Sequence, residues 1–234
     1  MRCQNHECMN LIDQIIEELM DASKSLAGSL LKTKVLASRI KDQEIVDWAD
    51  KEMAGYRGPD DQLPDYRHCR AVYWGIMQQR GIAMPEGPIP LMIFDDETRK
   101  RFFTPHIEQS VPAIESFINR GAEGGTIRKQ YAADICQFLT TRIVNENKTG
   151  LRIVTLTSII DVSEFIQVLS VIRAKLLDFM LKVESEVPAL AKPQHQIQPL
   201  PAEEKSKVSN IFYSVINISG DNNTVAAGNQ NDIK

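Results

Sequence analysis

The sequence has few of the features that identify common protein classes. Its 234 residues include only four cysteines, Cys3, Cys8, Cys69 and Cys136, which is too few for a disulfide framework in a chain of this length. No apolar run approaches the roughly 20 residues that a membrane-spanning helix needs, and the N-terminus lacks the apolar core of a secretory signal. We therefore expect a cytoplasmic protein that has no contact with the membrane.

The familiar catalytic motifs are also missing. The chain has no phosphate-binding loop, dinucleotide fingerprint, His-Glu-x-x-His or Gly-x-Ser-x-Gly pattern. Cys3, His6 and Cys8 lie close together, but a structural zinc site needs four ligands and the spacing offers no fourth. His68 and Cys69 are neighbours, and neighbours on an extended strand point to opposite faces. We predict no catalytic residues, no metal and no cofactor, and we favour a binding protein over an enzyme.

Basic and acidic residues are similar in number, with a small excess of acidic residues. The 27 lysines and arginines face 31 aspartates and glutamates, for a formal net charge of -4, which argues against a nucleic-acid partner. Asp95, Asp96 and Glu97 form an acidic cluster. We interpret them as the first turn of a helix, where negative charge interacts favourably with the helix macrodipole. We prefer this interpretation to a site for a divalent cation.

What the chain does contain is helical periodicity. Apolar residues recur at spacings of three and four from 10 to 26, from 29 to 40 and from 43 to 54, which predicts three consecutive N-terminal helices. The same spacing predicts helices over 105–119, 129–144 and, most clearly, 162–187, where Pro188 ends the pattern. β-Prone residues predict strands at 66–77 and 151–160.

The C-terminal segment differs in composition from the rest. After a Pro- and Gln-rich linker (188–207), residues 208–234 combine a β-prone run with a Gly-Asp-Asn-Asn turn signal. A strand this apolar needs a covering partner. We predict that tails from several copies pair and join the chains into a homo-oligomer, a trimer or larger. The alternatives are packing on its own domain and addition to another protein's sheet. The residues of the predicted oligomerisation element are Ile211, Phe212, Tyr213, Val215, Ile216, Ile218 and Val225.

Four other residues form a candidate ligand surface. Lys32 and Lys34 lie on the second predicted helix, and Tyr66 and Arg67 follow a proline, where they could present an aromatic ring and a cation to a nucleotide or base. The simpler interpretation, which we prefer, is that Arg67 pairs with an acidic residue such as Glu52 and that the tyrosines pack the turn against the helices.

The N-terminal third also resembles a known family. The residues that carry the resemblance are Ser23-Lys24-Ser25-Leu26, the run from Leu30 to Ala37, then Trp48, Glu52 and Gly55-Tyr56, and finally Leu63-Pro64-Asp65-Tyr66-Arg67. This pattern is similar to the AbiTii domain of bacterial abortive-infection proteins, and a weaker similarity continues from Val171 to Glu184. The resemblance implies a role in anti-phage defence and no catalytic residues.

Together these patterns predict a mainly α protein with minor β content. It has an N-terminal helical unit, a long C-terminal helix and a separate β-strand tail. We expect residues 1–9 to be a poorly ordered extension, 10–187 to be the AbiTii-like domain, 188–207 a linker and 208–234 the tail. The favoured function is a self-assembling defence protein that binds a phage or host component. The alternatives are an enzyme toxin with an unfamiliar site near Arg67 and Asp95, and an RNA- or nucleotide-binding module.

Overall fold

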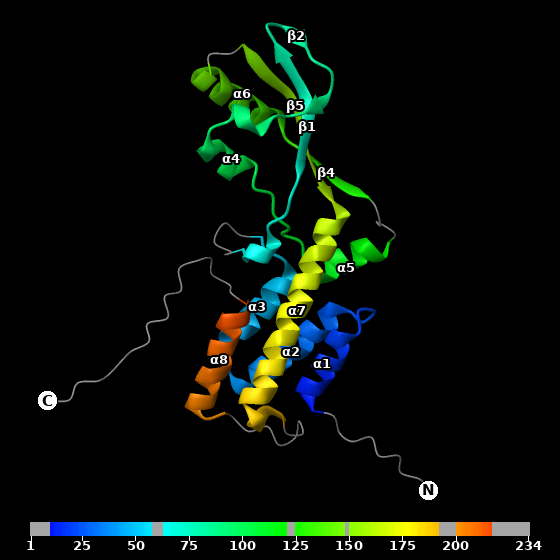
Figure 1. Cartoon of the computed structure of the whole chain (residues 1–234), viewed down its shortest axis with the longest axis vertical. Coiled ribbons are helices and arrows are strands. Elements are labelled where there is room, and N and C mark those ends of the chain that lie inside the picture. The colour runs from blue at the N-terminus through cyan, green and yellow to red at the C-terminus, as the bar shows by residue number, and fades with distance from the viewer. Residues whose placement is uncertain (1–9, 58–62, 121–124, 148–149, 192–199, 217–234) are drawn as a thin grey trace, which may run out of the picture.

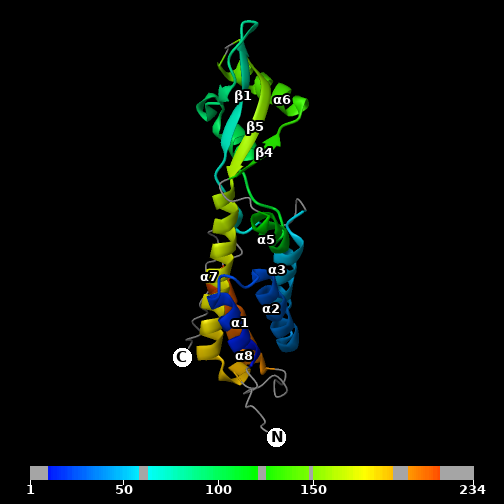
Figure 2. The same ribbon diagram turned by 90° about the vertical axis from the view of Figure 1, so that its right-hand side faces the viewer.

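The structure is a computed structural model that describes residues 10–57, 63–120, 125–147, 150–191 and 200–216. It is mostly helical with one five-stranded antiparallel sheet. The molecule is elongated, with a bundle of helices at one end and the sheet at the other (Figures 1 and 2). We call these two parts the helical body and the sheet unit.

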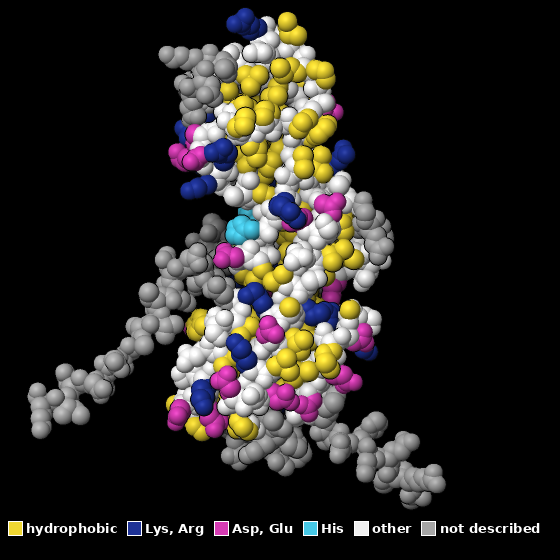
Figure 3. Space-filling view, viewed as in Figure 1, with side chains coloured by type: hydrophobic (Ala, Val, Ile, Leu, Met, Phe, Trp, Pro, Cys, Tyr) yellow, Lys and Arg dark blue, Asp and Glu magenta, His cyan; other side chains and the backbone are white. Residues whose placement is uncertain are grey.

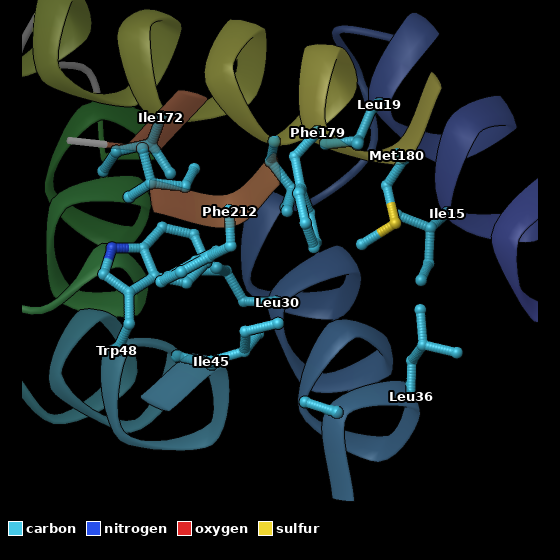
Figure 4. Close-up of a cluster of buried hydrophobic side chains, with 14 of the residues drawn as sticks. Ile15, Leu19, Leu30, Leu36, Ile45, Trp48, Ile172, Phe179, Met180 and Phe212 are labelled. Atoms are coloured by element: carbon cyan, nitrogen blue, oxygen red, sulfur yellow. The ribbon is translucent and has the colours of Figure 1, made fainter. Parts of the chain in front are cut away.

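The helical body is built around the 25-residue helix α7, which contacts α1, α5 and α8, while α2 packs against α1 and α3. Several of its helices begin at a side chain that accepts a hydrogen bond from the first turn, among them Asn10, Asp42 and Asp161. Figure 4 shows the core between α7, α8 and the N-terminal helices. The helices are α1 (Leu11–Met20), α2 (Leu26–Ile40), α3 (Gln43–Ala54), α5 (Val111–Asn119), α7 (Val162–Glu186) and α8 (Ala202–Ile216).

The sheet unit has a separate core. Its strands run in the order β2-β1-β5-β4, and β3 also pairs with β1. One face of the sheet is covered by α4, α6 and a 3-10 turn at Leu91–Ile93, and these bury a cluster that includes Tyr73, Leu139 and Leu156. The elements are β1 (Val72–Gln79), β2 (Ile82–Ala83), β3 (Gly87–Pro88), β4 (Thr126–Gln130), β5 (Leu151–Asp161), α4 (Asp96–Phe102) and α6 (Ala133–Asn147).

The two units are interleaved along the chain. The chain leaves the body after α3, builds β1 to α4, returns for α5, leaves again for β4, α6 and β5, and re-enters the body as α7. β5 ends at Asp161, whose side chain caps the first turn of α7. The sheet unit is therefore inserted in the middle of the sequence, and its strand β5 continues without a loop into α7.

Much of the predicted secondary structure is confirmed. The helices predicted over 29–40 and 43–54, the strand at 151–160 and the long helix before Pro188 are present within a few residues of their predicted bounds. The helix predicted over 10–26 is shorter, because α1 ends at Met20 and Leu26 already begins α2. The acidic cluster does begin a helix, with Asp95 accepting a hydrogen bond from the Thr98 amide at 2.7 Å. The prediction missed β4, because its five residues lie next to the helical pattern that starts near 129.

The predicted β-strand tail is wrong over its described residues, because strands occur only mid-chain and residues 208–216 belong to α8. Ile211, Phe212 and Ile216 are buried against the helical body, Val215 is partly buried, and Tyr213 is 37% exposed. Val208, Ile211, Phe212, Val215 and Ile216 have the three- and four-residue spacing of a helix face, and packing of that face overrides the β-propensity of the residues. Ile218 and Val225 lie outside the described residues.

The segment that joins α7 to α8 is shorter than the predicted linker. A 3-10 turn occupies Pro188–Ala191, and α8 begins at Ala202, five residues before the expected end of the linker at 207. Residues 1–9, which we expected to be a poorly ordered extension, are outside the described part of the chain.

Candidate functional site

Arg67 lies at the centre of a buried polar network and not at the surface. Both Arg67 and Glu52 are 0% exposed, and the guanidinium Nη2 pairs with the Glu52 carboxylate. Nη1 donates to the carbonyl oxygens of Ile107 at 3.0 Å and Gln109 at 2.6 Å. One arginine thus joins α3, the turn at Asp65–Arg67 and the segment before α5. The preferred interpretation of Arg67, a pair with Glu52, is confirmed.

Two tyrosines complete the network. The hydroxyls of Tyr56 and Tyr66 each donate to Glu52 Oε1 at 2.7 Å, and Trp48 Nε1 donates to the Tyr66 hydroxyl at 2.9 Å. Burial, followed by the negative charge of Glu52, raises the pKa of Tyr56 and of Tyr66 above the ordinary range. Both phenols stay neutral donors, so the arrangement holds the body together and offers no base or nucleophile.

The two lysines of the candidate ligand surface do not join this network. Lys32 Nζ lies 2.7 Å from the Glu18 carboxylate on α1, while Lys34 Nζ pairs with Asp50 on α3. The two side chains reach different neighbouring helices. The structure therefore brings Tyr66 and Arg67 together but leaves Lys32 and Lys34 in separate ion pairs, and ligand binding by these four residues stays a prediction.

The described cysteine and histidine side chains near this network have the following surroundings. Burial, followed by the charge of Glu164, raises the pKa of the Cys69 thiol to about 11, which is the opposite of what a nucleophilic cysteine needs. His68 and His106 face each other across an isolated β-bridge, with ring centroids 6.5 Å apart. Within the described residues, no cluster of three or more His, Cys, Asp or Glu could hold a metal ion.

A groove of about 820 Å³ lies between the C-terminal end of α1, α5 and α7. Two of its charged side chains, Arg173 and Glu115, are used at helix ends. Arg173 donates to four carbonyl oxygens, those of Glu18, Leu19, Asp21 and Lys24, and Glu115 accepts from the Ser25 hydroxyl and the Leu26 amide at the start of α2. The groove is therefore lined largely by apolar side chains, and Arg173 and Glu115 are committed to the fold.

The face of the sheet that no other described element covers is different. Along β1, Tyr73 and Gly75 are buried under α4 and α6, whereas Val72, Trp74 and Ile76 alternate with them and belong to neither hydrophobic core. Strand register places Val72 opposite Ile159, and Trp74 between Pro88 and Thr157. In Figure 3 hydrophobic side chains gather over the sheet unit.

Polar and basic residues border this apolar strip. Arg128 on β4 pairs in register with Ile159, Gln130 with Thr157, and Arg152 with Gln78. Arg128 and Arg152 are exposed, and within the described residues neither makes an ion pair. We define the open sheet face as Val72, Trp74, Ile76, Thr157, Ile159, Arg128, Gln130 and Arg152. It is the candidate functional site, because half of its side chains are exposed, the others (Trp74, Ile76, Thr157 and Ile159) are partly exposed, and none belongs to either core.

Comparison with known proteins identifies the family. The AbiTii family model matches residues 10–212. The chain belongs to the AbiTii family. The match covers the helical body and the sheet unit, up to residue 212 within α8. No curated protein and no solved structure matches the chain.

Membership of the AbiTii family implies an abortive-infection role against phage. The resemblance that the N-terminal third shows in the sequence is thereby confirmed and extended through the middle of the chain. No helix among the described residues is both long enough and apolar enough to cross a membrane.

Proposed function

We propose that this AbiTii protein acts in abortive infection by binding a phage or host component through the open sheet face, without catalysing a reaction. The observation that carries the defence role is the match of the family model to residues 10–212. The choice of binding over catalysis rests on the side chains. The buried polar groups serve the fold, and the accessible unusual surface is apolar with basic borders.

The alternative of a toxin with a site near Arg67 and Asp95 gains no support from the geometry. Arg67 is buried in the helical body, while Asp95 caps α4 in the sheet unit. Residues of one catalytic site must converge on a common substrate, and these two side chains are engaged with different partners in different units.

The proposal is tested by phage challenge. Cells that make the full chain are infected with a panel of unrelated phages, and plating efficiency is compared with cells that carry an empty vector. Abortive infection predicts reduced plating together with collapse of the bacterial culture at high phage input, because infected cells stop growing before phage are released. Normal plating across a broad panel, or protection in which every infected cell survives, would contradict the proposal.

Self-assembly stays a separate prediction. Ile211, Phe212 and Ile216 are buried against the chain's own helical body, so assembly of the folded protein would have to use other residues, such as those after Ile216. Removal of everything after Lys205 would delete most of α8 and open the core, so it cannot report on assembly. Removal of residues 217–234 leaves α8 intact. Light scattering on the full chain and on this shorter chain then measures whether those residues join copies.

A further inference from the structure

The whole-chain charge hides an uneven distribution. The segments that build the sheet unit, 69–104 and 126–161, contain ten lysines and arginines against seven aspartates and glutamates, a net charge of +3. The rest of the chain has 17 against 24, a net charge of -7. The acidic total is therefore a property of the helical body, and it is no argument against a polyanionic partner for the sheet unit.

The open sheet face carries two of these ten basic residues, Arg128 and Arg152, on either side of an aromatic ring. Trp74 lies on the central strand, with Val72 and Ile76 on either side of it along β1 and Thr157 across the ladder. Arg128 lies toward one end of the face and Arg152 toward the other. Arg128 is in register with Ile159 on β5. Ile159 and Arg152 are seven residues apart on that strand, or roughly 20 Å at the usual rise of a strand. The carboxylate nearest this face on β5, Asp161, accepts a hydrogen bond from the Ser163 amide as the cap of α7.

A second copy of this chain would fit the face poorly. Two such faces packed about a twofold axis would bury arginines against apolar side chains, with no uncommitted carboxylate on the registered strands to pair with them. An unpaired buried charge is strongly unfavourable.

A single-stranded nucleic acid matches all three parts of the face. Its bases have aromatic surfaces that stack on exposed rings, its phosphates pair with arginine, and its base edges can hydrogen-bond to hydroxyl and amide groups such as those of Thr157 and Gln130. A duplex does not match, because its stacked bases cannot reach a ring that lies on a sheet.

We propose that the open sheet face binds single-stranded RNA or DNA, with Trp74 stacking on a base and Arg128 and Arg152 contacting the phosphates on either side. This inference rests on the proposed binding function and names the chemical class of the partner. The aliphatic side chains of Val72, Ile76 and Ile159 provide the apolar floor around the stacked base.

The test is the fluorescence anisotropy of labelled ten-residue oligouridylate and oligothymidylate titrated with the full chain at low salt. A labelled duplex of the same length serves as the comparison. We expect both single strands to bind more tightly than the duplex, and the affinity to fall as salt is raised. The preference between the two oligomers tells whether the partner is RNA or DNA.

Two variants locate the binding. Trp74→Leu keeps an apolar side chain but removes the ring, and we expect at least about a tenfold loss of affinity, as for loss of one stacked base. The double variant Arg128→Gln/Arg152→Gln should reduce the slope of log K against log salt by about 1.4, since each phosphate contact on a single strand contributes about 0.7. Lys100→Gln is the matched control, because Lys100 is exposed on α4 on the covered side of the sheet. Melting temperatures confirm that each variant is folded.

Intrinsic fluorescence gives an independent readout. The chain has two tryptophans, and Trp48 is 3% exposed in the helical body. Quenching on addition of oligonucleotide should therefore come from Trp74 and disappear in Trp74→Leu.

Several results would overturn the inference: no binding of either oligomer at low salt, equal binding of duplex and single strand, or binding that Trp74→Leu leaves unchanged. If phage protection is observed but oligonucleotides do not bind, the proposed function stands and this inference fails, with a protein as the partner of the face. If oligonucleotides bind as predicted but no phage is restricted, the inference stands and the defence role fails.

Discussion

The two tryptophans of this chain lie in different surroundings. Trp48 is 3% exposed, packs edge-on against Phe212 with ring centroids 5.6 Å apart, and donates its indole N–H to Tyr66. Trp74 is partly exposed on an uncovered sheet and contributes to neither core. The helical body buries Trp48 together with the Arg67–Glu52 pair, whereas the described elements cover only one face of the sheet. The contrast supports our proposal that the body stabilises the chain and the sheet unit binds the partner.

The largest expected effect is a loss of stability of the helical body. Arg67→Ala leaves the Glu52 carboxylate buried without its cation and removes the hydrogen bonds to Ile107 and Gln109. Breaking a buried pair in this way costs about 3–5 kcal/mol, and we expect the free energy of unfolding in urea to fall by that amount. Arg70→Ala is the matched control, because the Arg70 side chain is 94% exposed in its pair with Glu164 and should cost under about 1 kcal/mol. Equal effects of the two variants would contradict the account.

A second prediction concerns α8. Phe212 is 0% exposed and contacts the rings of Trp48 and Phe179. We expect Phe212→Ala to destabilise the protein by about 3 kcal/mol, the lower end of the range for buried phenylalanine, because a terminal helix can shift to close part of the cavity. Tyr213→Ala, at the neighbouring half-exposed position, should have a smaller effect. If thermal melting shows the two variants to be alike, residues 208–216 do not form the helix described here.

The third prediction compares the effects on stability of replacing one glycine in the sheet unit and one in the helical body. A Cβ on Gly75 would lie 2.0 Å from the Thr155 carbonyl oxygen, so Gly75→Ala forces β1 and β5 apart. We expect a cost of about 1–3 kcal/mol, as for overpacking elsewhere. Hydrogen exchange should show the loss of protection mainly in the sheet unit. Gly28 in α2 has open space around its Cα, and Gly28→Ala should stabilise the body by about 0.5–1 kcal/mol. Destabilisation by both variants would show that the glycine environments are not as described.

The smallest expected effect is on the pH dependence of stability. The pKa of Cys69 rises from 9.0 to about 11 in the folded protein, so the unfolded chain releases this proton first as pH increases. The corresponding stabilisation is complete below pH 9 and is lost as pH rises through about 11. Urea denaturation at pH 8, 9, 10 and 11 should show a declining free energy of unfolding, with a shallower decline in Cys69→Ala. Alkylation of Cys69 as fast at pH 8 in the folded protein as in urea would contradict the prediction.

The parts of the fold that the sequence predicts well are those set by local periodicity. The helices over 10–54 and 162–187 repeat apolar residues at three and four, and each of these faces packs into the helical body. The pair of Arg67 with Glu52 could also be anticipated, because an arginine after a turn near an acidic helix has few other ways to be buried.

The tail shows why composition can mislead. Ile211, Phe212 and Val215 are typical of strands, but Val208, Ile211, Phe212 and Ile216 lie on one helical face that α3 and α7 bury. Lys175 donates to the last carbonyls of α8, those of Val215 and Ile216. The helical spacing was present in the sequence and would have distinguished the two interpretations.

The candidate site could not be predicted, because it depends on pairing between distant segments. Val72 and Ile159 meet only when β1 pairs with β5, and Arg128 joins them only through β4, which periodicity did not reveal. Nothing local to residues 72–76 indicates that α4 and α6 cover one face of the sheet and leave the other open.

We propose that the open sheet face is the functional surface and that the helical body supports it. The most direct test is plating of a restricted phage on cells that make Val72→Thr/Ile159→Thr, compared with cells that make Met20→Gln. Val72 is 56% exposed on the face, and Met20 is 67% exposed beside the groove of the body. With all proteins folded and equally abundant, we expect the face variant to lose protection by at least about tenfold, as when a contact surface loses important apolar contacts, and Met20→Gln to keep it. Full protection by the face variant, or loss of protection by Met20→Gln alone, would contradict the account.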